Sequence, residues 1–181
     1  FEAAIEAMLE SGQAKAAEKA GRAAADGVVV VKINNGGKKG VIVEVNSETD
    51  FVAKDASFAG FADEVASRAL ASDAADVDAL SALPLRDGED DTIAAAREAL
   101  IAKIGENIQV RRMVRFDDVA GTLHSYRHGQ RIGVIVDLVE GDETLGRDIA
   151  MHIAASNPLC VSADEVPAET IAAERAIFKQ Q

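Results

Sequence analysis

Cysteine is almost missing from this sequence, with Cys160 as its only representative among 181 residues. One thiol excludes an internal disulfide and suits a reducing compartment. No run of about 18 apolar residues occurs either, so the sequence offers no helix that could cross a membrane. The sequence starts at Phe1 without a basic segment or a signal-peptide core, and we expect no targeting signal in what reads as part of a longer chain.

Basic residues are scarce relative to acidic ones. Nineteen Lys and Arg residues stand against 31 Asp and Glu residues, which gives a formal net charge of −12 at pH 7. A surface this acidic repels phosphate backbones, so nucleic-acid binding is disfavoured and contact with basic patches on other proteins is favoured. Hydrophobic residues make up 48% of the chain, which is enough to bury a core in one domain or two small ones.

Residue patterns that support catalysis are also missing. The sequence has no Ser-His-Asp arrangement, no H-E-x-x-H motif and no nucleophile elbow. His124 and His128 fall on a predicted strand, where a separation of four residues is roughly 13 Å, too far to share a metal ion. The "GGKKG" segment leads into a strand and lacks phosphate-loop spacing, so it predicts a hairpin turn. His152 and Cys160 are expected to pack in the interior. We therefore expect no enzymatic activity, cofactor or metal.

Hydrophobic periodicity divides the chain into alternating helices and strands. Runs rich in β-branched residues predict strands at 28–33, 40–45, 107–116, 122–128 and 132–139. Apolar residues at helical spacing predict helices at 1–9, 12–26, 58–70, 93–104, 144–156 and 168–181. Gly105 stands where a helix commonly ends with a glycine, and Ser162 and Glu165 have capping-box spacing. The acidic segment 73–91 predicts a loop with a short helical turn.

An internal repeat predicts two related subdomains. The same four residues, "GVIV", begin at Gly40 and again at Gly133, and each copy continues with an acidic position, a polar turn and an Ala-rich helix. Two strand-strand-helix units indicate an α+β fold, in which each subdomain is a small antiparallel sheet covered by helices, with flanking helices at both ends. The expected divisions are an N-terminal helical module and connector, two core subdomains and the start of a further helix, at 1–24, 25–120, 121–160 and 161–181.

The two copies differ most in the turn that follows the second strand. The first copy has the longer turn, "NSETDFVAKDASF", against "VEGDETLG" in the second, and added length in a turn is often where function resides. Thr49 or Asp50 is expected to cap the following helix. Phe51 then has two interpretations: a hydrophobic staple packed on Val45 or Phe58, or an outward anchor that fills a pocket on a partner.

Several segments of the sequence resemble bacterial translation elongation factor Ts. They are "AAADGVV" before the first hairpin, "EVNSETDFVAKD" in the long turn, "KIGENIQVRR" from Lys103, "SYRHGQRIGV" from Ser125 and "IAMHIAAS" from Ile149, all in the order found in that family. The resemblance runs from about Gly12 to about Pro158. It implies a core of two subdomains, with 1–9 as the last helix of an N-terminal module and 167–181 as the first part of a coiled coil.

The resemblance also implies a function, which is guanine-nucleotide exchange on elongation factor Tu in the cytoplasm, without a cofactor. The partner would be bound in its GDP-bound or nucleotide-free form, and GDP would leave because its Mg²⁺ and phosphate site is disturbed until GTP binds. Self-association stays open. Carried over by position, the implied partner-binding residues are Thr49, Asp50, Phe51 and Val52 in the long turn, with Ile104, Gly105 and His128.

Two other functions remain open from the residues alone. A regulatory module with a small-ligand site between paired β-β-α units would show the same repeat. A purely structural or RNA-associated subunit could use Arg111, Arg112 and Arg115, although a solvated strand face is the simpler interpretation of three arginines in so acidic a chain.

Overall fold

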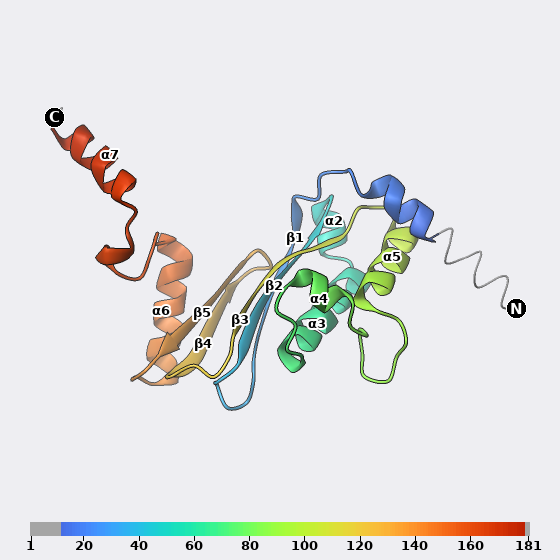
Figure 1. Cartoon of the computed structure of the whole chain (residues 1–181), viewed down its shortest axis with the longest axis horizontal. Coiled ribbons are helices and arrows are strands. Elements are labelled where there is room, and N and C mark those ends of the chain that lie inside the picture. Colours follow the sequence, from blue (N-terminus) through green and yellow to red (C-terminus); the bar gives the residue numbers. More distant parts are fainter. Residues whose placement is uncertain (1–11, 180–181) are drawn as a thin grey trace, which may run out of the picture.

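A computed structural model of the chain describes residues 12–179. The helix predicted at 1–9 lies outside these residues. Two antiparallel sheets and their covering helices form the molecule, with one sheet of three strands and one of two (Figure 1). The predicted α+β class, with two related sheet-and-helix units and helices toward both ends, is confirmed.

The first unit is built on a hairpin between β1 (Asp26–Ile33) and β2 (Gly40–Ser47). Its turn is closed by the Asn34 side chain, whose Oδ1 accepts hydrogen bonds from the backbone N–H groups of Lys38 and Lys39 at 2.9 and 3.0 Å. The third strand, β3 (Gln109–Phe116), pairs antiparallel with β2, so the order is β1-β2-β3. The "GGKKG" segment is therefore a hairpin turn, as predicted.

Helix α3 (Ala56–Ala71) covers one face of this sheet. Alternate β2 residues Val41, Val43 and Val45 are buried under it, because side chains alternate between the two faces of a strand. Phe58 and Phe61 meet them from the helix, followed at helical spacing by Val65 and Ala69. The short α4 (Val77–Ser81) and the longer α5 (Ile93–Ile104) complete this core through Leu80, Ile93, Leu100 and Ile101.

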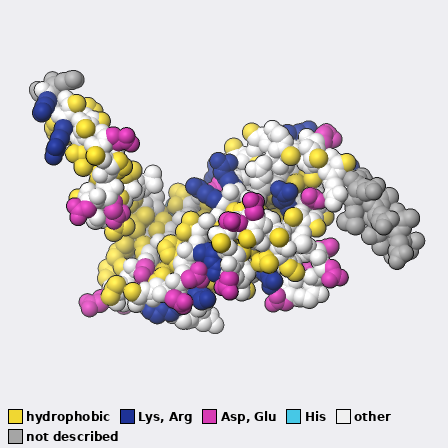
Figure 2. All heavy atoms as spheres, viewed as in Figure 1, with side chains coloured by type: hydrophobic (Ala, Val, Ile, Leu, Met, Phe, Trp, Pro, Cys, Tyr) yellow, Lys and Arg dark blue, Asp and Glu magenta, His cyan; other side chains and the backbone are white. Residues whose placement is uncertain are grey.

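The second unit repeats this plan with fewer parts. Strands β4 (Thr122–His128) and β5 (Ile132–Leu138) form a hairpin, and α6 (Glu143–Ser156) packs across both strands. Gly146 allows the close approach, since a Cβ at this position would lie 2.2 Å from Cγ of His124. A 3₁₀ turn (Ala163–Glu165) and α7 (Ala168–Phe178) follow. Several apolar side chains along α6, α7 and the segment between them lie exposed (Figure 2).

The two units contact each other through β1 and the β4–β5 hairpin. The backbone N–H of Val29 donates to the carbonyl oxygen of Gln130 at 2.7 Å. Gly133 lies against the side chains of Val29 and Val31, and the Lys38 ammonium donates to three consecutive carbonyl oxygens that begin at Val119. These contacts set the direction of the second hairpin relative to the first sheet.

Four details differ from the sequence predictions. The helix predicted over 12–26 ends at residue 19, because the chain must turn before Asp26 pairs with Ser47 in the sheet. His152 is exposed, since α6 buries the opposite face, where Gly146 and Ala150 lie. Cys160 is only partly buried. The capping-box spacing of Ser162 and Glu165 occurs at the 3₁₀ turn, and Ser162 makes no side-chain cap there.

The arginines of β3 are not a uniformly solvated strand face. The Arg115 side chain is only 12% exposed, and its Nη1 donates to the carbonyl oxygen of Ala69 at 2.9 Å and to that of Ser72. It therefore satisfies the C-terminal carbonyl groups of α3. Arg112 is exposed and pairs with Glu44 of β2.

In residues 12–179, no helix is both long enough and apolar enough to cross a membrane.

Candidate partner-binding face

The long turn after β2 contains a helix of a single turn, α2 (Asp50–Ala53). Thr49 is its N-cap: the backbone is extended there, and Oγ1 accepts from the N–H of Val52 at 3.4 Å. Ala53 is buried and Val52 packs against the core, so the helix is held from one side. Asp55 ends the turn by capping α3, accepting from the N–H groups of Ser57 and Phe58.

Phe51 points away from the core, and 81% of its side chain is exposed. Val45 and Phe58, its two candidate staple partners, are fully buried by other residues. The staple interpretation of Phe51 is therefore wrong and the side chain has the outward orientation. Burying an exposed phenylalanine ring is favourable, so Phe51 on its capped, anchored turn is available to fill a pocket on a partner.

Asp50 does not cap α2, contrary to one of the two sequence expectations. It is the first helical residue, and its Oδ2 accepts from the Lys54 ammonium at 2.7 Å. This hydrogen bond and the Lys54 charge hold the pKa of the Asp50 carboxyl below its usual value, with a smaller contribution from the charge of Arg131. Asp50 is therefore a solvent-facing carboxylate beside Phe51, available to a hydrogen-bond donor on a partner.

Ile104 and Gly105 lie at the C-terminal end of α5. Gly105 caps this helix in the left-handed conformation, with φ of 88°, and its N–H donates to the carbonyl oxygen of Ile101 at 2.8 Å. The glycine cap predicted from the sequence is confirmed. Ile104 is half-buried against the core, whereas Gly105 is exposed and its missing Cβ leaves open space above the backbone.

Hydrogen bonds join these two segments directly. Glu106 accepts from both donors of Thr49, the backbone N–H at 3.0 Å and Oγ1 at 2.7 Å. In return, Glu48 accepts from the backbone N–H of Asn107 at 2.7 Å. We call these four residues the glutamate clasp. Sequence reasoning missed it because the paired residues are 57 to 59 positions apart, and no local pattern reports such a pairing.

His128 lies at the turn of the β4–β5 hairpin, on a different subdomain from Phe51. It is exposed, and its Nδ1 lies 3.1 Å from the Tyr126 hydroxyl. In the same turn Arg131 forms an ion pair of 2.7 Å with Asp26, at the start of β1. Figure 1 shows β1 beginning, and β4 ending, toward the part of the molecule where α2 lies. The fold thus brings the candidate residues of both subdomains to one end.

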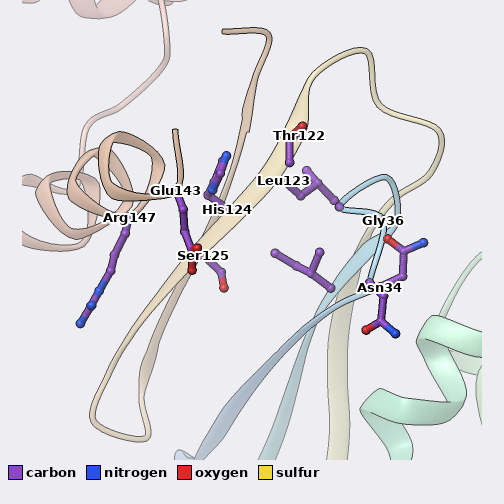
Figure 3. Close-up of a pocket in the computed structure, with 11 residues that line it drawn as sticks. Asn34, Gly36, Thr122, Leu123, His124, Ser125, Glu143 and Arg147 are labelled. Atoms are coloured by element: carbon purple, nitrogen blue, oxygen red, sulfur yellow. The ribbon is translucent and has the colours of Figure 1, made fainter. Parts of the chain in front are cut away.

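A hollow of about 470 Å³ lies at the other end of the hairpins, away from these residues. Figure 3 shows its walls: Asn34 and Gly36 of the β1–β2 turn, Thr122 to Ser125 of β4, and Glu143 and Arg147 of α6. His124 lies between β4 and α6. The hollow is partly open to solvent, and the described residues contain no cluster of three or more His, Cys, Asp or Glu side chains able to hold a metal. A partly open hollow of this kind does not by itself indicate a small-ligand site.

Comparison with known proteins agrees with the motifs of the long turn. A family model described as "Elongation factor TS" matches residues 48–181. Over 181 residues the chain is 53% identical to elongation factor Ts of Alkalilimnicola ehrlichii and 51% identical to that of Alcanivorax borkumensis. Both alignments cover the whole of this chain and 61% and 62% of the relative, respectively.

The chain belongs to the elongation factor Ts family. The elongation factor Ts of Methylococcus capsulatus is 54% identical, again over the whole chain and 61% of the relative. The chain therefore spans about three fifths of the length of these curated relatives. Within the family match lie the glutamate clasp, α2 and the β4–β5 hairpin, so the described face is made of family sequence.

Proposed function

We propose that this chain is a guanine-nucleotide exchange factor for elongation factor Tu. It binds the GDP-bound or nucleotide-free form, disturbs the Mg²⁺ and phosphate site, and so promotes release of GDP until GTP binds. Thr49, Asp50, Phe51 and Val52 form the element that inserts into the partner, and Ile104, Gly105 and His128 bind around it. The exposed Phe51 on its capped turn is the observation that carries the proposal.

Exchange of this kind needs no chemical step from the chain. A protein that binds the nucleotide-free partner more tightly than the GDP-bound partner must weaken GDP binding by the same factor, because the two equilibria are linked. The required property is a rigid surface that fits one conformation of the partner better than another. A phenylalanine has few rotamers to lose on binding and buries a large apolar area, so it is well suited to this role.

The direct test is stopped-flow release of fluorescent GDP from purified elongation factor Tu, with and without the chain. We expect the chain to accelerate GDP release strongly. The acceleration should be smaller when EDTA has already removed Mg²⁺, because the Mg²⁺ site is then already disturbed before the chain binds. No acceleration at any concentration would contradict the proposed function.

Replacement of Phe51 by alanine tests the anchor. We expect Phe51→Ala to leave the fold intact and to slow stimulated GDP release by about thirtyfold, since a buried aromatic anchor contributes about 2 kcal/mol or more to binding. Phe178→Ala is a matched control, because Phe178 is also a largely exposed phenylalanine, 75% exposed, but lies on α7. If Phe51→Ala instead melts at a lower temperature but stimulates GDP release normally per folded molecule, the anchor role is wrong.

A further inference from the structure

Helix α2 is too short to hold its own shape. Its four residues form one turn, and a single isolated turn is unfavourable in water because several backbone dihedrals are fixed for one hydrogen bond. Phe51 adds little packing, since most of its side chain is in solvent. Val52 and Ala53 hold the turn from the core side. At its start, the direction of Phe51 depends on how firmly the chain is held at Thr49.

Glu106 holds Thr49 at both of its donors. One carboxylate oxygen accepts from the backbone N–H and the other accepts from Oγ1, so the residue is fixed in position and in rotamer. With its proton directed to Glu106, Oγ1 has its lone pairs free to accept from the N–H of Val52 and cap α2. Hydrogen bonds to a charged acceptor are stronger than those between neutral groups.

The other side of the glutamate clasp is firmly anchored. Asn107 is almost fully buried, and its Nδ2 donates to the carbonyl oxygen of Arg22 at 2.7 Å. Its backbone N–H donates to Glu48, which also lies 3.7 Å from Nη1 of Arg22. Glu106 therefore lies between Gly105 and the buried, hydrogen-bonded Asn107, which fixes the backbone on its C-terminal side.

We propose that Glu106 is a positioning residue, which fixes the direction of Phe51 relative to Ile104 and Gly105 so that both segments meet one partner surface at once. The inference rests on the proposed exchange function and adds a residue to it. Its physical basis is preorganisation: a turn already held in its binding geometry loses less conformational entropy when the complex forms. Glu106 acts through Thr49 and Phe51 and needs no contact with the partner.

The test compares Glu106→Ala and Glu106→Gln with Glu64→Ala in the GDP-release assay. Glu64 is the matched control, because it is also a partly buried glutamate that accepts two hydrogen bonds, here from Arg86, but it lies on α3 away from the turn. We expect Glu106→Ala to raise the concentration for half-maximal stimulation about tenfold, with a smaller change in the maximal rate, and Glu64→Ala to leave both unchanged.

A double-mutant cycle separates positioning from direct contact. Because Glu106 acts through Phe51, Glu106→Ala should add little to the loss already caused by Phe51→Ala. Glu106→Gln should show an intermediate effect of about threefold, since its carboxamide oxygen still accepts from one Thr49 donor. Circular dichroism melts measure the folded fraction of each variant. If Glu106→Ala does not fold, Glu106→Gln replaces it in the comparison between the wild-type and Phe51→Ala backgrounds.

Each outcome decides the inference. If wild type fails to accelerate GDP release, the proposed function is overturned and this inference falls with it. If wild type is active and Glu106→Ala behaves like Glu64→Ala, only the positioning role is overturned. An equal loss in the wild-type and Phe51→Ala backgrounds would mean that Glu106 contacts the partner itself, which also overturns the role proposed here.

Discussion

Single side chains on the candidate face differ in what they can contribute to binding. Phe51 presents a large apolar ring on a held turn, whereas His128 presents a smaller polar ring whose Nδ1 lies 3.1 Å from the Tyr126 hydroxyl. Burying an exposed aromatic hydrocarbon is favourable in proportion to its area, while burying an imidazole also removes its hydration. We therefore expect Phe51 to contribute more to binding than His128.

The ranking predicts that His128→Ala weakens stimulated GDP release less than Phe51→Ala does. The loss should be about threefold to tenfold, in line with the removal of one partly solvated contact. Release of fluorescent GDP, measured for both variants at the same folded concentration, checks the order. A loss from His128→Ala equal to or larger than that from Phe51→Ala would reverse the ranking.

Among the secondary-structure elements, α5 has a C-terminal end that both caps the helix and forms part of the candidate face. Gly105, the C-cap that follows its last residue, has φ of 88°, a conformation that costs a residue with a Cβ about 1–2 kcal/mol. The same left-handed residue redirects the chain so that Glu106 reaches Thr49. The helix end and the clasp are thus one structural feature of the face.

Replacement of Gly105 by alanine should lower the free energy of unfolding by about 1 kcal/mol, because of backbone strain alone: no atom lies within 4 Å of the added Cβ. The opposite result is expected for Gly60→Ala, inside α3, where the Cβ also meets open space but φ is helical, so the variant gains up to about 1 kcal/mol. Urea unfolding measures both. Equal stabilisation by the two substitutions would show that the strain at Gly105 is relieved elsewhere.

Across the whole molecule, the face depends on how two subdomains are docked. The β4–β5 hairpin lies against the outer side of β1, where Gly133 faces Val29 and Val31, and Arg131 pairs with Asp26. Without this contact, His128 would have no fixed relation to Phe51. The face is therefore a property of the assembled pair of units.

Gly133→Ala is predicted to disturb this docking. The added Cβ would lie 2.7 Å from Cγ2 of Val31 and 2.8 Å from Cγ1 of Val29, so the hairpin must move away from β1. We expect a loss of about 1–3 kcal/mol in the free energy of unfolding and weaker stimulation of GDP release. Gly36→Ala, in the β1–β2 turn, has only a contact of 3.9 Å and serves as control. If Gly133→Ala has the same free energy of unfolding as the wild type, the predicted clash is wrong.

Local patterns in the sequence were enough to predict the five strands, the helices that follow them, the glycine cap at Gly105 and the repeated sheet-and-helix unit. These features follow from side-chain periodicity and from backbone preferences, which act over a few residues. Motif order pointed to the elongation factor Ts family, and the family match agrees. Failures such as His152 and Cys160 arose because an apolar neighbourhood in sequence does not say which face of an element is covered.

Only the tertiary structure decided the direction of Phe51, the cap supplied by Thr49 rather than Asp50, and the burial of Arg115 against the end of α3. It also revealed the glutamate clasp and brought His128 to the end of the molecule that carries α2. Each of these depends on contacts between residues far apart in the chain. Such contacts form only when whole elements pack, so no pattern within a short segment of sequence can specify them.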